Sequence, residues 1–297
     1  MSVKKYGLVE VEGNMGAFPV FPGIGAKPYE TLETQVDAET LSAPSSTASP
    51  APASRIAVEL VPRSRSALLA ELEEVRALGS VQTVNIPDLL RFSMRSWHGC
   101  ALANSAVPHT IPHIRAIDID PRGPLPMAAA LDAAGIAEVL VIEGDAPADM
   151  GHRTYPVTSL EIIRKFRREM PHVSVWAGLD PYRQSFARER DYAEAKLEAG
   201  AVGVFTQPFF DLRLVELWAE LLPGCQVFWG ATTVTGEKSM SYWQSRNRAV
   251  FPRSFEPTLA WQRQFAAELL AFARQTGSHA YFMPVRSSVG EYLSGVL

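Results

Sequence analysis

Cysteine is scarce in this sequence, because the 297 residues contain only Cys100 and Cys225. Two thiols are too few for a disulfide framework or for a zinc site built from thiolates, so we expect a protein of a reducing compartment, with the cytoplasm as its location. Long hydrophobic runs are also missing, and no segment approaches the roughly 18 apolar residues that span a bilayer. The lysines at the start are not followed by the apolar core of a secretory signal.

An excess of charge of one sign is lacking as well, since 28 basic residues stand against 32 acidic ones and the net charge is −4. This balance offers no electrostatic footprint for nucleic acid or for anionic membranes, so we expect a small molecule as the partner. The sequence has no phosphate loop, no G-x-S-x-G of hydrolases and no G-x-G-x-x-G after its first predicted strand. No lysine lies at a predicted strand end, which disfavours a Schiff-base aldolase.

The sequence divides into three segments that differ in amino-acid composition. Residues 42–54 consist only of Ser, Ala, Pro and Thr, which is typical of a flexible linker. Residues 1–41 mix aromatic residues with Gly and Pro, and we interpret them as an N-terminal arm without an independent domain. Residues 55–297 have the length of one large domain, and the 47% of hydrophobic residues in the whole sequence excludes general disorder.

The long C-terminal part alternates between short apolar runs and segments with helical periodicity. The predicted strands are 55–61, 80–86, 111–119, 137–142, 173–177, 202–205, 226–229 and 279–283. Such alternation implies parallel strands that are joined by crossover helices. Eight units in about 243 residues predict a single (β/α)8 TIM barrel with an N-terminal extension, with an open doubly wound sheet as the alternative.

Barrel enzymes place their reactive groups at the carboxyl ends of the strands. Glu59 lies near the end of the first strand, where a desolvated carboxyl group would have a raised pKa and would suit general acid catalysis. Since neighbours on a strand alternate faces, an outward-facing Glu59 is an equal alternative. After the fourth strand, Gly144 permits a tight turn between Glu143 and Asp145, which are either ligand-facing acids or parts of a solvated turn.

Other strand ends carry groups that suit ligand binding. The amide of Gln207 can donate and accept at once, as a heterocycle edge requires, and Phe209 and Phe210 either form pocket walls or pack between barrel and helices. His109 and His113 lie four residues apart in PHTIPHI, a spacing that places two residues on the same face of a strand, so a metal pair is conceivable. The alternatives for these histidines are a place in the core or a hydrogen bond to a ligand, and no further His or Cys is arranged nearby.

These segments together resemble the methylenetetrahydrofolate reductase family, β/α barrels that reduce the methylene bridge of 5,10-methylenetetrahydrofolate to a methyl group. The resemblance extends over roughly residues 55–297. Its most specific part is KLEAGAVGVFTQPFFD, which resembles KVDAGADFIITQLFFD of the family. VELVPR resembles FEFFPP, IPHIRAID resembles the family's proline-histidine segment, VLVIEGDAP resembles LRGDPP, and HAYFMPVR resembles HFYTLNR.

The resemblance implies that Glu59 is the general acid, that Asp145 lies beside the pterin ring and that Gln207 contacts the folate. The expected site has catalytic Glu59 and Asp145, substrate-binding Gln207, Gln244, Phe209 and Phe210, and cofactor-binding His113, Tyr155, Asn85 and Lys196, with no metal. The expected reductant is NAD(P)H, with NADH favoured. The implied setting is one-carbon metabolism, including methionine biosynthesis.

Several positions depart from the family, and they lie on its flavin side. Glu143 stands where the family has an Arg before Gly-Asp, Tyr192 and Ala195 replace an Asn and an Arg that hold the flavin, and only Lys196 remains. Reversing one charge and removing a guanidinium weakens the hold on a pyrophosphate. We therefore expect weak or no FAD binding and a hydride that passes directly from NAD(P)H to the folate.

Other functions remain open from the sequence. A conventional FAD-dependent reductase would react by a ping-pong mechanism. A folate-binding barrel without catalysis would have no need of an acid at Glu59. A barrel methyltransferase would hand methyl groups to a corrinoid and would require a partner subunit. The sequence also leaves open a homo-oligomer and the choice between biosynthetic and catabolic pathways.

Overall fold

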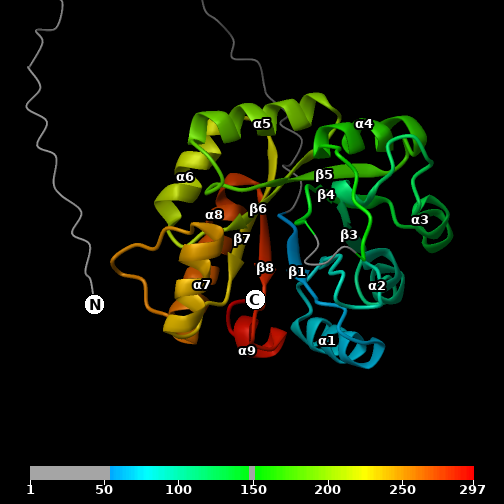
Figure 1. Ribbon diagram of the computed structural model, residues 1–297. Coiled ribbons are helices and arrows are strands. Elements are labelled where there is room, and N and C mark those ends of the chain that lie inside the picture. The colour runs from blue at the N-terminus through cyan, green and yellow to red at the C-terminus, as the bar shows by residue number, and fades with distance from the viewer. Residues whose placement is uncertain (1–53, 147–150) are drawn as a thin grey trace, which may run out of the picture. The chain divides into compact units, whose positions relative to one another are not determined.

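A computed structural model describes residues 54–146 and 151–297, which form a closed barrel of parallel strands (Figure 1). The strands are β1 (Ile56–Glu59), β2 (Thr83–Ile86), β3 (His109–Arg115), β4 (Glu138–Ile142), β5 (Ser174–Leu179), β6 (Gly203–Pro208), β7 (Gln226–Thr232) and β8 (His279–Met283). They follow one another in chain order, and β8 pairs with β1. The predicted (β/α)8 fold is confirmed. The predicted arm 1–41 and all of the linker except Ser54 lie outside the described residues.

Helices surround the barrel and connect successive strands (Figure 1). They are α1 (Arg65–Leu78), α2 (Ser96–Ala103), α3 (Ala128–Ala134), α4 (Ser159–Glu169), α5 (Phe186–Glu198), α6 (Leu212–Leu221), α7 (Glu237–Asn247), α8 (Leu259–Thr276) and α9 (Val289–Leu293). The sequence pattern does not predict α2 or α7. The first is short and mostly buried, and the second buries only Ser239, so neither shows an amphipathic stripe.

The third strand differs from its predicted range of 111–119. It begins at His109 and ends at Arg115, and the 3-10 helix η1 (Ala116–Asp118) follows at once. The turn closes where the backbone N–H of Ile119 donates to the carbonyl of Ala116 at 3.0 Å. Alternating apolar residues continue through this segment, which is why the pattern extends the strand too far. Asp118 consequently lies in the turn rather than at a strand end.

Alternate residues of the strands fill the inside of the barrel. One buried cluster consists of Ala57, Ile111, Leu140, Trp176, Phe205, Phe228, Tyr281 and Met283. The rings of Phe205 and Phe228 stack with their centroids 4.0 Å apart, and Trp176 meets both rings edge-on. This aromatic layer keeps water out of the barrel interior, because its members are almost completely buried.

The amino-terminal end of the barrel carries an ion network that we call the floor (Arg55, Thr83, His109, Glu138 and Trp176). Arg55 donates to both carboxylate oxygens of Glu138, at 2.9 and 3.0 Å, and also to the hydroxyl of Thr83 at 2.9 Å. The Trp176 indole donates to Glu138 at 2.8 Å, and His109 Nδ1 lies 2.9 Å from it. Although burial alone raises the pKa of Glu138, the hydrogen bonds and charge of Arg55 hold that pKa below its ordinary value.

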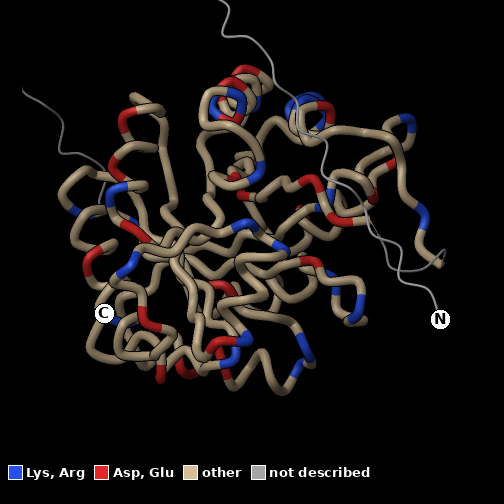
Figure 2. Tube along the Cα trace, turned by 60° about the vertical axis from the view of Figure 1, so that its left-hand side comes forward, with Lys and Arg blue, Asp and Glu red and all other residues tan. Residues whose placement is uncertain are grey.

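Acidic and basic residues are interspersed along the chain of the helices (Figure 2). Among the helices of residues 54–146 and 151–297, none is long and apolar enough to cross a membrane.

Candidate active site

Glu59 faces the interior of the barrel at its carboxyl end, the mouth. It is the last residue of β1, it pairs in register with Asn85, and it follows the interior residue Ala57 by two positions. Its neighbours Val58 and Leu60 belong to the core outside the barrel. The Glu59 side chain is 20% exposed. Of the two orientations that the sequence leaves open, the inward one is observed.

The carboxyl group of Glu59 lies over the aromatic layer and is poorly hydrated. This desolvation raises the pKa of Glu59 to about 7, although the hydrogen bond from Tyr281 acts in the opposite direction. At neutral pH a carboxyl group of this kind is present in both its protonated and its ionised form. It can therefore give a proton to a bound molecule and regain one afterwards.

Tyr281 is the site residue that the sequence reasoning missed. It pairs in register with Ala57, so its ring starts one layer below Glu59, and its hydroxyl donates a hydrogen bond to Glu59 Oε2. Burial, and then the neighbouring carboxylate, raise the pKa of Tyr281 far above its ordinary value, so the phenol stays protonated. The predicted closure of the barrel could have pointed to Tyr281, because closure makes the first and last strands neighbours.

His113 and Asn85 complete the group around the acid. His113 Nε2 lies 3.9 Å from Glu59 Oε2, and Asn85 Nδ2 lies 3.5 Å from His113 Nε2. Burial lowers the pKa of His113 to about 3, so the imidazole is neutral at pH 7 and its contact with Glu59 is not an ion pair. Asn85 Oδ1 is buried and lacks a hydrogen-bond partner in the described part of the chain. Such an acceptor is available to a ligand.

His109 lies at the other end of β3 from the mouth. Four residues of extended chain separate it from His113 by roughly 13 Å, and it contacts Glu138 in the floor. The two histidines therefore cannot share a metal ion. Within residues 54–146 and 151–297, no group of three or more His, Cys, Asp or Glu side chains is arranged to hold one.

Gln207 is exposed near the end of β6, where the register with β7 shifts between Phe205 and Pro208. Gly230 of β7 makes this irregularity possible, because a Cβ atom there would lie 2.6 Å from the carbonyl oxygen of Thr206. The backbone N–H of Gly230 donates to the hydroxyl of Thr206 at 2.8 Å. Bulges of this kind re-aim side chains at the rims of barrels, and Gln207 is the exposed residue at this one.

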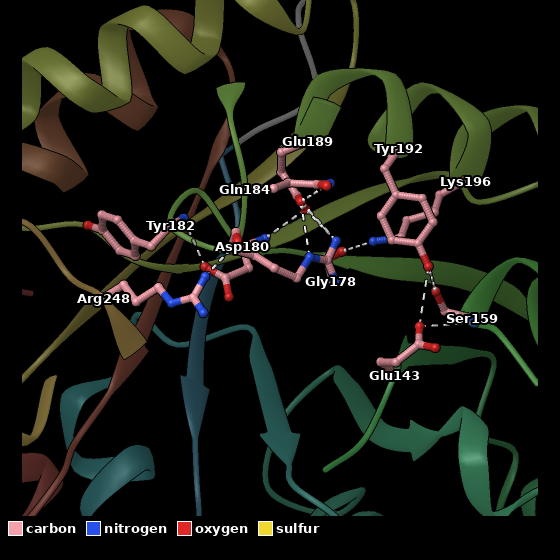
Figure 3. A network of polar contacts seen from close by, with 11 residues as sticks. Glu143, Ser159, Gly178, Asp180, Tyr182, Gln184, Glu189, Tyr192, Lys196 and Arg248 are labelled. Carbon is pink, nitrogen blue, oxygen red and sulfur yellow. Dashed lines mark hydrogen bonds and ion pairs between the residues drawn. The ribbon is translucent and has the colours of Figure 1, made fainter. Parts of the chain in front are cut away.

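Asp145 and Glu143 follow β4 but differ in their surroundings. Asp145 is exposed, and its carbonyl accepts a hydrogen bond from Arg115 at 2.6 Å. Glu143 Oε2 accepts from the backbone N–H of Ser159, the first residue of α4, and from the hydroxyl of Tyr192, both at 3.2 Å (Figure 3). The Glu143 carboxylate thus lies at the positive end of α4, where helices bind anions.

Lys196 is buried between α5 and β5. Its Nζ donates to the carbonyl of Gly178 at 2.6 Å and lies 3.9 Å from the ring centroid of Tyr192 (Figure 3). Burial, followed by the charge of Arg183, lowers the pKa of Lys196 to about 8. The same region holds the completely buried Glu189, to which Arg183 donates through two nitrogens. This lysine therefore binds groups of the protein itself.

The other predicted site residues follow β6 or β4 or lie on α7. Phe209 is completely buried in the core between strands and helices, and Phe210 belongs to a separate aromatic cluster with Trp243 of α7. Both rings thus pack against other side chains of the protein. Gln244 is exposed on α7. Tyr155 is partly buried against the core.

Comparison with known proteins finds likeness in fold only. No protein family matches the sequence, and no curated protein matches it. An uncharacterised protein from Clostridium thermocellum that binds two copies of 5-methyl-5,6,7,8-tetrahydrofolic acid has a TM-score of 0.57 at 10% identity, over 82% of this chain and 94% of that one. A 2,3-dimethylmalate lyase of the PEP mutase/isocitrate lyase superfamily has a TM-score of 0.51 at 10% identity, over 80% and 76%. Such identities establish the barrel fold and no shared activity.

Proposed function

We propose that this protein is a methylenetetrahydrofolate reductase that uses NAD(P)H, with NADH favoured, and transfers the hydride to the folate without a flavin. The observation that carries the proposal is Glu59, a carboxyl group with a pKa of about 7 that faces the barrel mouth. The family that this sequence resembles has its general acid at this position. A protein that only bound folate would have no need of such an acid.

The chemistry begins with the ring that bridges N5 and N10 of the substrate. Protonated Glu59 gives its proton to N10, the bond between N10 and the methylene carbon breaks, and an iminium forms at N5. A hydride from the reduced nicotinamide adds to that carbon, which yields the N5-methyl group and the oxidised nicotinamide. Ionised Glu59 then regains a proton from water. A general acid of this kind contributes about 10²–10⁴ in rate.

The neighbours of Glu59 assist this step. Tyr281 donates to Oε2 and so leaves Oε1 as the oxygen that carries the transferred proton. Asn85 Oδ1 offers an acceptor near the acid. The exposed Asp145 carboxylate suits the amino and ring N–H groups of a pterin, and the Gln207 amide can fix the pterin plane.

A flavin pyrophosphate does not fit the residues present. The Glu143 carboxylate lies at the N-terminus of α4 and would repel a phosphate there. Tyr192 and Ala195 supply no positive charge, and Lys196 donates inward to Gly178. The proposed mechanism therefore contains no flavin step.

Folate as the substrate class has a second line of support. The Clostridium thermocellum protein, whose chain is covered over 94% of its length, binds 5-methyltetrahydrofolate. That compound is the product of the proposed reaction.

The test is NADH oxidation by the purified full chain, with and without 5,10-methylenetetrahydrofolate and with and without added FAD. We expect folate-dependent oxidation, intersecting lines in steady-state plots, and no flavin absorbance in the protein. A stoichiometric flavin spectrum with parallel lines would instead support the ping-pong reductase. Folate binding without NADH oxidation would indicate a binding barrel, and methyl transfer to a corrinoid would indicate a methyltransferase.

A further inference from the structure

The segment that carries Asp145 is fastened to the turn after β3. The backbone N–H of Ile117 donates to the carbonyl of Glu143 at 3.2 Å, and the carbonyl of Ile117 accepts from Tyr155 at 2.8 Å. Arg115 adds a side-chain bond, from Nη2 to the carbonyl of Asp145 at 2.6 Å. Hydrogen bonds from the end of β3 and from the turn after it thus hold the first residues after β4.

Arg115 makes two directed bonds at once. Its Nε donates to Asp118 Oδ2 at 2.9 Å while Nη2 holds the Asp145 carbonyl, and its side chain is only 9% exposed. A guanidinium is planar and rigid, so two bonds from different nitrogens fix both its position and its orientation. An ammonium group on a flexible stem cannot reproduce this pair of bonds.

The partner of Arg115 is itself anchored. Asp118 is 6% exposed, and Arg95 Nη2 lies 3.8 Å from its Oδ2. Arg95 in turn donates through two nitrogens to the buried Asp88, at 2.9 and 2.5 Å. Because each of these poorly hydrated charges has an opposite charge beside it, the cluster holds Arg115 in one place.

Gly144 shows how closely the segment passes over Arg115. Its φ is +90°, and a Cβ atom there would lie 3.1 Å from both Arg115 Cβ and Ile117 Cγ1. A side chain at this position would push the segment away from the end of β3. The turn before Asp145 is therefore specified by contact as well as by hydrogen bonds.

From these contacts we propose that Arg115 is a positioning residue of the active site, which fixes Asp145 at the barrel mouth by holding its carbonyl oxygen. Arg115 acts through Asp145 and contacts no substrate. The part of this inference that concerns folate binding rests on the proposed function. The attachment of the segment does not depend on it.

The first experiment is a double-mutant cycle on the dissociation constant of 5-methyltetrahydrofolate, measured with the full chain. We expect Arg115→Lys and Asp145→Ala each to raise this constant about tenfold, and the double variant to bind no more weakly than Asp145→Ala alone. Arg76→Lys is the matched control, because Arg76 is an exposed arginine of α1 that pairs with Glu73 and belongs to neither the cluster nor the segment that carries Asp145. We expect it to change the constant less than twofold. The proposal would be overturned if the double variant raised the dissociation constant by the product of the two single effects. It would also be overturned if Arg115→Lys left the dissociation constant unchanged.

The second experiment measures backbone hydrogen exchange in residues 143–146 without any ligand. We expect Arg115→Lys to speed exchange there about tenfold, while exchange in β1 and β8 stays as in the wild type, which also shows that the variant is folded. Unchanged exchange in residues 143–146 would overturn the proposal even if the wild type bound no folate. Absence of folate binding with faster exchange would count against the proposed function alone.

Discussion

Glu59 and Glu138 lie at opposite ends of the same barrel, and their pKa values are shifted in opposite directions. Both are partly withdrawn from water, with side chains 20% and 13% exposed. Glu59 accepts one hydrogen bond from the neutral phenol of Tyr281, and desolvation raises its pKa to about 7. Glu138 faces the guanidinium of Arg55 and the indole of Trp176, and its pKa lies below the ordinary value.

Burial alone therefore does not decide the ionisation state of a carboxyl group. Burial opposes ionisation at both ends, and the donors around the group determine which effect is larger. The floor is saturated with donors and serves stability, as the amino-terminal face of a barrel usually does. The mouth has an acid of raised pKa, and beside it the buried Oδ1 of Asn85 has no hydrogen-bond partner among residues 54–146 and 151–297.

The largest expected effect comes from removing the acid at the mouth. We expect Glu59→Gln to lower kcat by about 10²–10⁴ while folate binding stays nearly unchanged, since the amide still accepts from Tyr281 but has no proton to give. Turnover with NADH and the dissociation constant of 5-methyltetrahydrofolate are the measurements. Turnover that survives the substitution would remove Glu59 from the mechanism.

The corresponding change in the floor tests the other half of the comparison. We expect Glu138→Ala to lower the free energy of unfolding by about 3 kcal/mol, because it leaves the charge of Arg55 without its partner in a poorly hydrated place. Urea denaturation measures this loss. At a temperature where the variant is folded, kcat should equal that of the wild type, and a loss of kcat like that of Glu59→Gln would contradict the division of roles.

The dependence of stability on pH should have opposite signs at the two ends. A pKa of Glu59 that rises from 4.5 to about 7 on folding stabilises the folded state fully below pH 4.5, and this stabilisation is lost as the pH rises through 7. We therefore expect Glu59→Gln to gain stability relative to the wild type between pH 4 and pH 8, by roughly 3 kcal/mol.

Glu138 provides the contrast for that measurement. Its lowered pKa contributes stability above its ordinary value of 4.5, which is lost as the pH falls below it. The free energy of unfolding of Glu138→Gln should therefore lie closer to that of the wild type at acidic pH than at neutral pH. Urea denaturation at several pH values gives both curves, and curves of the same sign would contradict the assigned pKa shifts.

The smallest expected effect comes from Tyr281→Phe. The hydrogen bond from Tyr281 lowers the pKa of Glu59, so its removal should raise that pKa. The reaction needs protonated Glu59, and the decline of the rate at alkaline pH should therefore move to higher pH. We expect kcat at neutral pH to fall about tenfold or less, through loss of one hydrogen bond. A pH–rate profile that does not move would exclude a direct effect of Tyr281 on the acid.

The fold can be predicted from the sequence because strand and helix periods repeat in order, and Glu59 can be selected because the strand ends of a barrel converge. The face that Glu59 occupies cannot be predicted, since it depends on register with β2 and β8. Tyr281 lies 222 positions away in the sequence, and only closure of the barrel brings it to Glu59. The burial of Phe209 and Phe210 likewise depends on helices that pack over the strand ends.

The most direct test of the account is to follow deuterium from NADH that is labelled at the transferred position of C4. The purified full chain, without added flavin, is incubated with labelled NADH and 5,10-methylenetetrahydrofolate, and the product is analysed by mass spectrometry. We predict one deuterium atom in the N5-methyl group, because the hydride passes directly from nicotinamide to folate. Product without deuterium would mean exchange with solvent on a flavin, and no product would contradict the assignment as a reductase.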